Sequence, residues 1–234
     1  GLKVASLVGG MVAGADSIDD MALLRHGGMG RLFARAYAPS TLGSFLRAFT
    51  FGHVRQLDAV ASRFLIRLTR LLGVGTAAGA EEAEGGYALL DIDDTIIEVH
   101  GHAKQGAGFG YSGVRGLNAL LATVTTSGSA PVVVAQRLRK GSCGSPRGAK
   151  RLVADALKTV STLHGRSDVK PLLRADSAFY GAPTVGAALR GGAQVSVTVR
   201  LDPKVKAAIA TISQEEWTPI EYTDAVFDEP TSMW

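Results

Sequence analysis

Three carboxylates interrupt an apolar segment that otherwise has the pattern of a β-strand. Residues 87–99 read Tyr-Ala-Leu-Leu-Asp-Ile-Asp-Asp-Thr-Ile-Ile-Glu-Val, so that Asp91, Asp93 and Asp94 stand beside Thr95. Like charges this close are costly in a half-buried setting unless one takes a proton or a cation lies between them. Carboxylate oxygens suit magnesium and manganese. The segment therefore indicates a metal-dependent site that acts on phosphate, against the alternative of ordinary surface aspartates at a strand end.

The basic side chains are concentrated in two parts of the sequence. Residues 1–72 hold nine basic and four acidic side chains, and residues 136–151 hold six basic side chains and no acidic one. Such clusters favour a polyanionic partner, because neutralising phosphates releases counterions. The alternative is that these charges only solvate helix faces and loop ends.

The cysteine count and the hydropathy pattern limit the cellular compartments in which we expect the protein. The single cysteine, Cys143, excludes an internal disulfide framework, and no set of Cys and His has zinc spacing. The longest apolar stretch, residues 4–15, is broken by Gly9, Gly10 and Gly14, is too short to span a bilayer and runs into acidic residues. We therefore expect a cytoplasmic protein without membrane contact.

The first third of the sequence has helical periodicity. An amphipathic helix is predicted over residues 17–25, a second after Pro39 with Ser40 and Thr41 as caps, and a longer one over residues 54–72. Residues 73–86 are rich in Gly, Ala and Glu and read as a linker, which places a domain boundary near residue 80. The sequence starts without methionine and ends within a segment that has the pattern of a folded region. We therefore expect the sequence to be truncated at both ends.

Beyond the linker the pattern changes to strands. Strands are predicted over 87–99, 117–125, 131–137, 169–175 and 194–201, helices over 145–164 and 183–189, and a glycine-rich turn over 101–116. The order is βββαβαβ, with the first three strands antiparallel. Since a strand–helix–strand crossover makes neighbouring strands parallel, the fourth strand should lie beside the first. Asp176 is then expected close to Asp93.

Several segments in one order carry a family resemblance. They are Gly-Ala-Asp-Ser-Ile-Asp-Asp at 14–20, Pro-Ser-Thr-Leu-Gly-Ser-Phe-Leu-Arg at 39–47, Leu-Asp-Ile-Asp-Asp-Thr at 90–95, Gly-Phe-Gly-Tyr at 108–111 and Leu-Arg-Ala-Asp-Ser-Ala-Phe at 173–179. With them the chain resembles bacterial insertion-sequence transposases of the DDE type. The resemblance implies an α/β fold whose mixed sheet is ribonuclease H-like. It implies a helical DNA-binding segment with linker (1–80), an incomplete catalytic domain (81–213) and the start of an inserted region (214–234).

The resemblance also implies site residues. The family's first two catalytic aspartates fall on Asp93 and Asp176, which would bind two Mg²⁺ or Mn²⁺ ions, whereas Asp91 is a weaker candidate. The third acidic residue, a glutamate after the insertion, is not assigned to any residue here. The implied activity is phosphodiester hydrolysis at insertion-sequence ends and strand transfer to target DNA, by a homodimer in the DNA complex. The basic residues that we expect to contact DNA are Arg47, Arg55, Arg137, Arg139, Lys140 and Arg174.

Other functions compete with this one. Asp91 and Asp93 also resemble the nucleophile motif of haloacid-dehalogenase-type phosphatases, but no strand-end acidic pair follows. A stand-alone ribonuclease H-like nuclease and a non-catalytic DNA-binding remnant are further alternatives. A metal site at His100 and His102 is not expected, because hard cations prefer oxygen.

Two smaller features complete the set of candidates. Phe109 and Tyr111 could stack on flipped bases, but packing in the core or the turn is the prediction. Cys143 has no paired base and is not expected to be a nucleophile.

Overall fold

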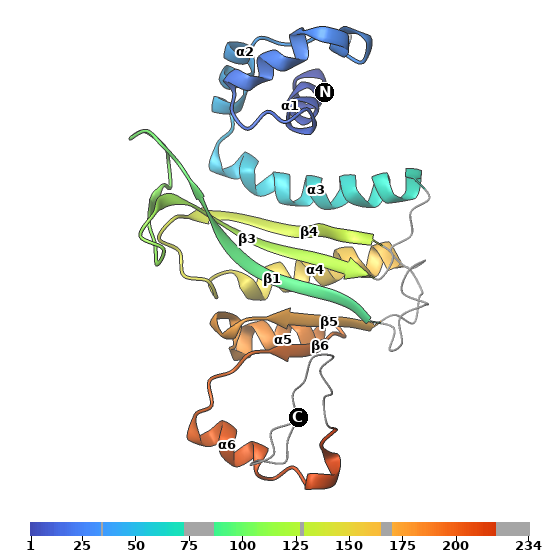
Figure 1. Cartoon of the computed structure of the whole chain (residues 1–234), viewed down its shortest axis with the longest axis vertical. Helices are drawn as coiled ribbons and strands as arrows, with labels where there is room; N and C mark the ends of the chain where they lie inside the picture. Colours follow the sequence, from blue (N-terminus) through green and yellow to red (C-terminus); the bar gives the residue numbers. More distant parts are fainter. Residues whose placement is uncertain (34, 73–86, 127–128, 165–169, 219–234) are drawn as a thin grey trace, which may run out of the picture.

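The computed structural model describes residues 1–33, 35–72, 87–126, 129–164 and 170–218. The helical N-terminal part, the central sheet and the last helix follow one another along the long axis of the molecule (Figure 1). Among the described residues, none of the helices has both the length and the apolar character of a membrane span. The predicted linker and most of the predicted inserted region lie outside the described residues.

One mixed sheet organises the fold. Its strands are β1 (Tyr87–Glu98), β2 (Gly108–Phe109), β3 (Arg115–Thr126), β4 (Ser129–Lys140), β5 (Lys170–Ala175) and β6 (Gln194–Val197). β1 pairs antiparallel with β3 and parallel with β5, while β4 pairs with the far side of β3 and β6 with the far side of β5. The predicted order and the α/β fold class are confirmed, with the two-residue β2 added inside the predicted turn.

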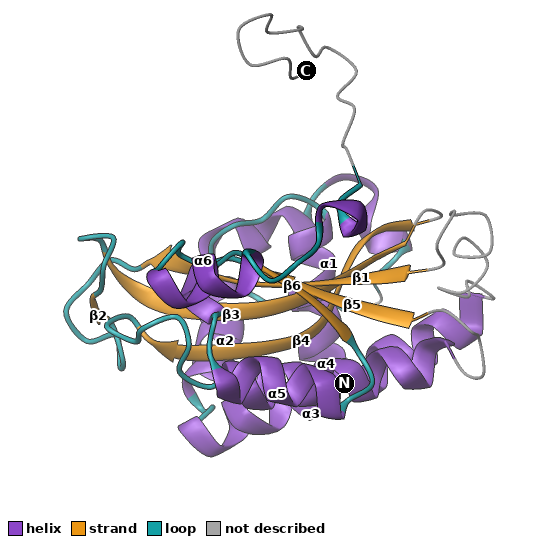
Figure 2. Cartoon of the chain, turned by 90° about the horizontal axis from the view of Figure 1, so that it is seen from below, coloured by secondary structure: helices purple, strands orange, loops and turns teal. Residues whose placement is uncertain are grey.

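The helices α4 (Ala149–His164) and α5 (Ala182–Arg190) cover one face of this sheet (Figure 2). Side chains alternate between the two faces of a strand. Accordingly Ala88, Leu90 and Ile92 of β1 are buried against the helices, together with Leu152 and Val153 of α4. The odd-numbered residues of β1, which include Asp91 and Asp93, therefore lie on the opposite, open face.

The N-terminal part has a small core of its own. It consists of α1 (Leu2–Val12), two 3-10 helices (Asp19–Arg25 and Gly27–Arg31) and α2 (Pro39–Arg47), which bury Leu7, Ala15, Met21 and Leu42. α1 was not predicted, because its glycines read as breaks. They are instead points of close approach, since a Cβ added at Gly10 would lie 2.2 Å from the sulfur of Met21.

Two predictions in this part are corrected. Residues 19–25 form a 3-10 helix, preceded by reciprocal hydrogen bonds between Ser17 and Asp20, rather than an α-helix over 17–25. The N-cap of α2 is Ala38, with Pro39 at the start of the helix, and no side chain caps it. Proline favours the first helical position because its missing N–H would have no partner there. Ser40 and Thr41 are thus not the caps.

The long helix α3 (Phe51–Leu72) links the N-terminal part to the sheet. It packs against β4 and α4, and its Leu65 contributes to the main core. After β6, which ends before the predicted Leu201, the unpredicted helix α6 (Pro203–Ile209) is capped by the side chain of Asp202. None of the residues of α6 is buried, so the open face of the sheet has no packed helix in the described part of the chain.

Candidate active site

Asp93 and Asp176 meet on the open face of the sheet. In the parallel pair β1–β5, Asp91 is in register with Arg174 and Ile92 with Ala175, so Asp93 and Asp176 are the next residues along. Residues in register on parallel strands point to the same face. Both aspartates line one open hollow of about 470 Å³, with Ser196 among its other residues. The structure brings the two together as expected, and their catalytic role stays a prediction.

Each carboxylate is held by one backbone N–H. Asp93 Oδ1 accepts a hydrogen bond from the N–H of Asp94 at 2.7 Å, and Asp176 Oδ1 accepts one from the N–H of Ala178 at 3.0 Å. Asp176 thereby caps the 3-10 helix Ser177–Phe179, which the buried ring of Phe179 anchors in the core. No hydrogen bond from the described residues reaches the second oxygen of either group. Both carboxylates are exposed and can offer this oxygen to a ligand.

Asp91, unlike Asp93, is paired with an arginine side chain. Arg174 donates two hydrogen bonds to its carboxylate, from Nε at 2.7 Å and from the terminal nitrogen at 2.8 Å. This hydrogen-bonded pair raises the pKa of Arg174 above its ordinary value. A carboxylate in such a bidentate pair is a poor nucleophile and a poor metal ligand. The phosphatase alternative, which needs Asp91 to attack phosphorus, therefore has no support here.

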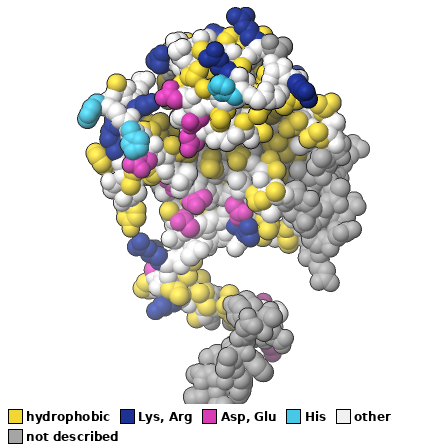
Figure 3. All heavy atoms as spheres, turned by 45° about the horizontal axis from the view of Figure 1, so that its top comes forward, with side chains coloured by type: hydrophobic (Ala, Val, Ile, Leu, Met, Phe, Trp, Pro, Cys, Tyr) yellow, Lys and Arg dark blue, Asp and Glu magenta, His cyan; other side chains and the backbone are white. Residues whose placement is uncertain are grey.

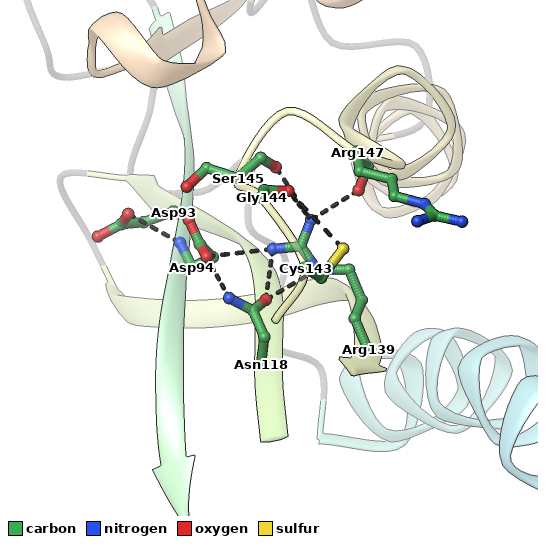
Figure 4. A network of polar contacts seen from close by, with 8 residues as sticks. All are labelled: Asp93, Asp94, Asn118, Arg139, Cys143, Gly144, Ser145 and Arg147. Atoms are coloured by element: carbon green, nitrogen blue, oxygen red, sulfur yellow. Dashed lines mark hydrogen bonds and ion pairs between the residues drawn. The ribbon is translucent and has the colours of Figure 1, made fainter. Parts of the chain in front are cut away.

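Asp94 points to the helical face and belongs to a buried network (Figure 4). It accepts hydrogen bonds from Arg139, at 3.1 Å, and from the side-chain amide of Asn118. Arg139 also donates to the Asn118 carbonyl oxygen, at 2.8 Å, and to the backbone oxygens of Ser145 and Arg147, at 2.9 and 2.6 Å. The network fixes β1, β3, β4 and the loop before α4 to one another, directly behind Asp93. Sequence reasoning missed it, because only the fold brings these strands together.

The six basic residues that we expect to contact DNA differ in their exposure and in their ion-pair partners. The Arg137 side chain is buried between Asp58 of α3 and Asp155 of α4, and Arg139 is used by the network above. Both side chains are engaged within the chain, and their contact with phosphate stays a prediction. Arg174 lies in the hollow but is paired with Asp91. Arg55 is half-buried and lies 3.4 Å from Asp58. Arg47 and Lys140 are exposed.

The aromatic residues of the glycine-rich loop are not packed. The side chain of Phe109 is 66% exposed and that of Tyr111 is fully exposed, so the packing prediction is wrong. The cause is a close backbone approach, since a Cβ added at Gly110 would lie 2.4 Å from the carbonyl oxygen of Gly141. The backbone of the loop therefore lies against the end of β4, and its side chains turn outward.

The remaining metal candidates are few. His100 lies exposed beyond β1, as does His102. Among the described residues no group of three or more His, Cys, Asp or Glu side chains is arranged to hold a metal ion. Asp93 and Asp176 are the two acidic candidates that the hollow supplies besides the paired Asp91.

Comparisons with known proteins bear on this arrangement. Three similar solved structures are a piggyBac transposase synaptic complex with hairpin DNA and two paired-end complexes of the Mos1 transposase, one of them with Mn. The piggyBac structure shares 12% identity at a TM-score of 0.40 and covers 92% of this chain. The Mos1 structures share 8% and 7% identity at TM-scores of 0.32 and 0.33, each covering 89% of this chain. This chain spans 44% of the piggyBac chain and 64% of each Mos1 chain.

The likeness to these structures is loose, and the family assignment rests on the sequence. No curated protein matches the chain. The family model described as "Transposase DDE domain" matches residues 84–224, which include the whole sheet and the hollow with both aspartates. The chain belongs to the family of transposases with a DDE domain.

Proposed function

We propose that this chain provides the DNA-cleaving part of a transposase, in which Asp93 and Asp176 bind the divalent cations that phosphodiester chemistry needs. The observation that carries the proposal is the meeting of these carboxylates on neighbouring parallel strands, where both line one hollow and each has an oxygen that accepts no hydrogen bond from the described residues. In this proposal residues 1–80 bind DNA and residues 81–213 form the catalytic domain. Residues 214–234 begin an inserted region.

The charge of the hollow supports a cation. Three aspartates and one arginine line it, and the pairing of Asp91 with Arg174 leaves Asp93 and Asp176 uncompensated. A DNA phosphate would be repelled by these two charges unless a cation lay between them. Their hard oxygen atoms fit Mg²⁺ or Mn²⁺. In such sites two divalent ions activate the attacking oxygen and stabilise the leaving one.

The chain's own residues hold this site in place. The N–H groups of Asp94 and Ala178 orient the two carboxylates before any ligand binds, which lowers the cost of ordering them. The ion pair Asp91–Arg174 lies on the same face of the sheet, with Asp91 two residues before Asp93 on β1 and Arg174, on β5, two residues before Asp176. The positive charge of Arg174 limits the net negative charge of the hollow. The third acidic ligand of the family is not assigned to any residue of this chain.

The partners follow from the same proposal. The substrates are the ends of an insertion sequence and a target DNA, bound by a homodimer in the cytoplasm. Basic side chains are frequent over the N-terminal helices at the top of Figure 3, and Arg47 is one of the exposed ones. A metal-dependent nuclease without strand transfer is the second candidate, since the carboxylate hollow would serve both.

Metal binding and DNA cleavage test the proposal separately. We expect Asp93→Asn and Asp176→Asn each to weaken Mn²⁺ binding, measured by electron paramagnetic resonance, and to abolish Mn²⁺-dependent nicking of a supercoiled plasmid. Binding of a DNA duplex should persist in both variants. Asp19→Asn, the same chemical change at an exposed N-terminal position, is the matched control. Nicking at the parental rate by either hollow variant would contradict the proposal, and joined strand-transfer products would distinguish a transposase from a simple nuclease.

A further inference from the structure

The helical face carries a second charged surface, on the side of the sheet away from the carboxylate hollow. Three hollows lie on this face: one of about 710 Å³ between α4 and α5, one of about 530 Å³ at the end of β4, and one of about 620 Å³ between α3 and α4. Arg151 lines all three. Its side chain is 76% exposed, so it stands at the centre of a continuous surface.

The charge of this surface is opposite to that of the carboxylate hollow. Ten basic and two acidic side chains line the three hollows. The two acidic ones, Asp58 and Asp155, are both ion-paired with the buried Arg137, and Arg139 is used by its own network. Asp58 also lies 3.4 Å from Arg55, and Asp155 lies 3.9 Å from the exposed Arg151. Eight basic residues remain, and we call them the α4 basic surface: Arg55, Arg63, Lys140, Arg147, Lys150, Arg151, Lys158 and Arg190.

The spacing of these charges matches a nucleic acid backbone. Lys150 and Lys158 are eight residues apart on α4, which corresponds to about 12 Å along a helix that rises 1.5 Å per residue. The major groove of B-DNA is also about 12 Å wide, so cations at this separation can contact the two phosphate strands that border it. Between them the hollow next to α5 has an apolar floor that includes Leu157 and Ala187. Its rim holds Lys150, Lys158 and Arg190.

We propose that the α4 basic surface binds the phosphate backbone of a second stretch of duplex DNA, without reading its sequence. The inference rests on the proposed function, and it adds a site to it. The surface and the carboxylate hollow lie on opposite faces of the sheet. The DNA held at α4 is therefore not the segment whose phosphodiester is cut at Asp93 and Asp176. It is a separate duplex, which the free duplex probe used in the test represents.

Salt dependence of binding tests the proposal. The probe is a fluorescent duplex of arbitrary sequence, titrated with the full chain at several KCl concentrations. Removing one phosphate-binding side chain lowers the slope of log affinity against log salt by about 0.9. We expect Arg151→Ala/Lys158→Ala to lower the slope by about 1.8. Between 50 and 200 mM KCl, the variant should then lose about 12-fold less affinity than the parent.

A matched control removes two charges elsewhere. Lys204→Ala/Lys206→Ala changes two exposed lysines of α6 and should leave the slope unchanged. An unchanged slope in the α4 variant, or an equal fall in the control, would overturn the proposal. The unmodified chain gives a second measurement that does not depend on the folding of a variant. DNA should protect Lys150 and Lys158, but not Lys204 and Lys206, from acetylation read by mass spectrometry.

The outcomes separate this proposal from the proposed function. Asp93→Asn should keep the parental salt slope while it loses plasmid nicking. If the parent does not nick DNA but the α4 variant still has the lower slope, the DNA surface stands and the nuclease proposal fails. If DNA leaves Lys150 and Lys158 unprotected, the surface serves another acidic partner, such as a protein, and the DNA proposal is wrong.

Discussion

Replacing Arg137 by methionine should destabilise the protein by about 1.5–4 kcal/mol. Arg137 lies on β4 with its side chain 9% exposed, and it bridges Asp58 of α3 and Asp155 of α4. Methionine keeps much of the packing of the arginine stem but removes both charged contacts. The bridge connects the long helix α3 to the sheet and to α4, so its loss weakens the attachment of the N-terminal part.

The magnitude follows from the exposure of the two partners. A hydrogen bond to a charged group contributes about 1.5–3 kcal/mol. The Asp58 side chain is 17% exposed, and Arg55 stays 3.4 Å from it when Arg137 is replaced. The loss of the Arg137–Asp58 pair should therefore lower the free energy of unfolding by an amount within this range. Asp155 is 46% exposed and becomes rehydrated, so its share falls to the ~0–1 kcal/mol of surface pairs. For a protein of this size, the total of about 1.5–4 kcal/mol lowers the melting temperature by about 3–16 °C.

Urea denaturation of Arg137→Met, Asp58→Asn and Asp155→Asn measures these shares, and circular dichroism serves as the readout. We expect Asp58→Asn to cost more than Asp155→Asn. The double variant Arg137→Met/Asp58→Asn should cost less than the sum of its parts, because the two residues share one interaction. The reasoning would be refuted if Arg137→Met lowered the free energy of unfolding by less than about 1 kcal/mol, or if Asp155→Asn lowered it more than Asp58→Asn. Either result would mean that burial does not set the strength of these ion pairs.

Two further variants test the site and its frame. Asp91→Asn should lower stability by at most about 1 kcal/mol, because its pair with Arg174 is 34% and 46% exposed, and it should retain Mn²⁺ binding that Asp93→Asn loses. Equal loss of Mn²⁺ by both variants would make Asp91 a ligand. Gly141→Ala should destabilise the fold by about 3 kcal/mol or more, because the added Cβ would lie 2.0 Å from the carbonyl oxygen of Gly116. A melting temperature within 2 °C or so of the parent would show that these strands can move apart.

Sequence reasoning succeeded where local pattern and chain topology were sufficient. The alternation of β1 and the crossover through α4 predicted that Asp93 and Asp176 would meet. Both are consequences of strand geometry and of the handedness of connections. The roles of Asp94 and Arg139 could not be predicted, because their partners lie on other strands and at loop carbonyls that only the folded chain brings near. The same limit applies to Arg137, whose charge suggested DNA but whose neighbours are two aspartates.

Glycine was the other source of error. In α1, Gly9 and Gly10 resembled breaks, but they allow Phe33 and Met21 to contact the helix backbone. Around the loop of Phe109, glycines permit a backbone approach that turns the aromatic rings outward. A glycine that allows close contact and one that ends an element look alike in the sequence, and only the neighbouring atoms distinguish them.

The two aspartates of the hollow differ in mechanical support. Asp93 lies inside a ladder in which ten consecutive residues of β1 pair with β3, so its position is shared with a stiff, continuous ribbon. Asp176 stands just past the last residue of β5 and leads directly into a three-residue helical turn. In the site that we propose, Asp93 therefore shares its position with a paired strand, whereas the position of Asp176 depends on the short turn that its own carboxylate caps and that the buried Phe179 anchors.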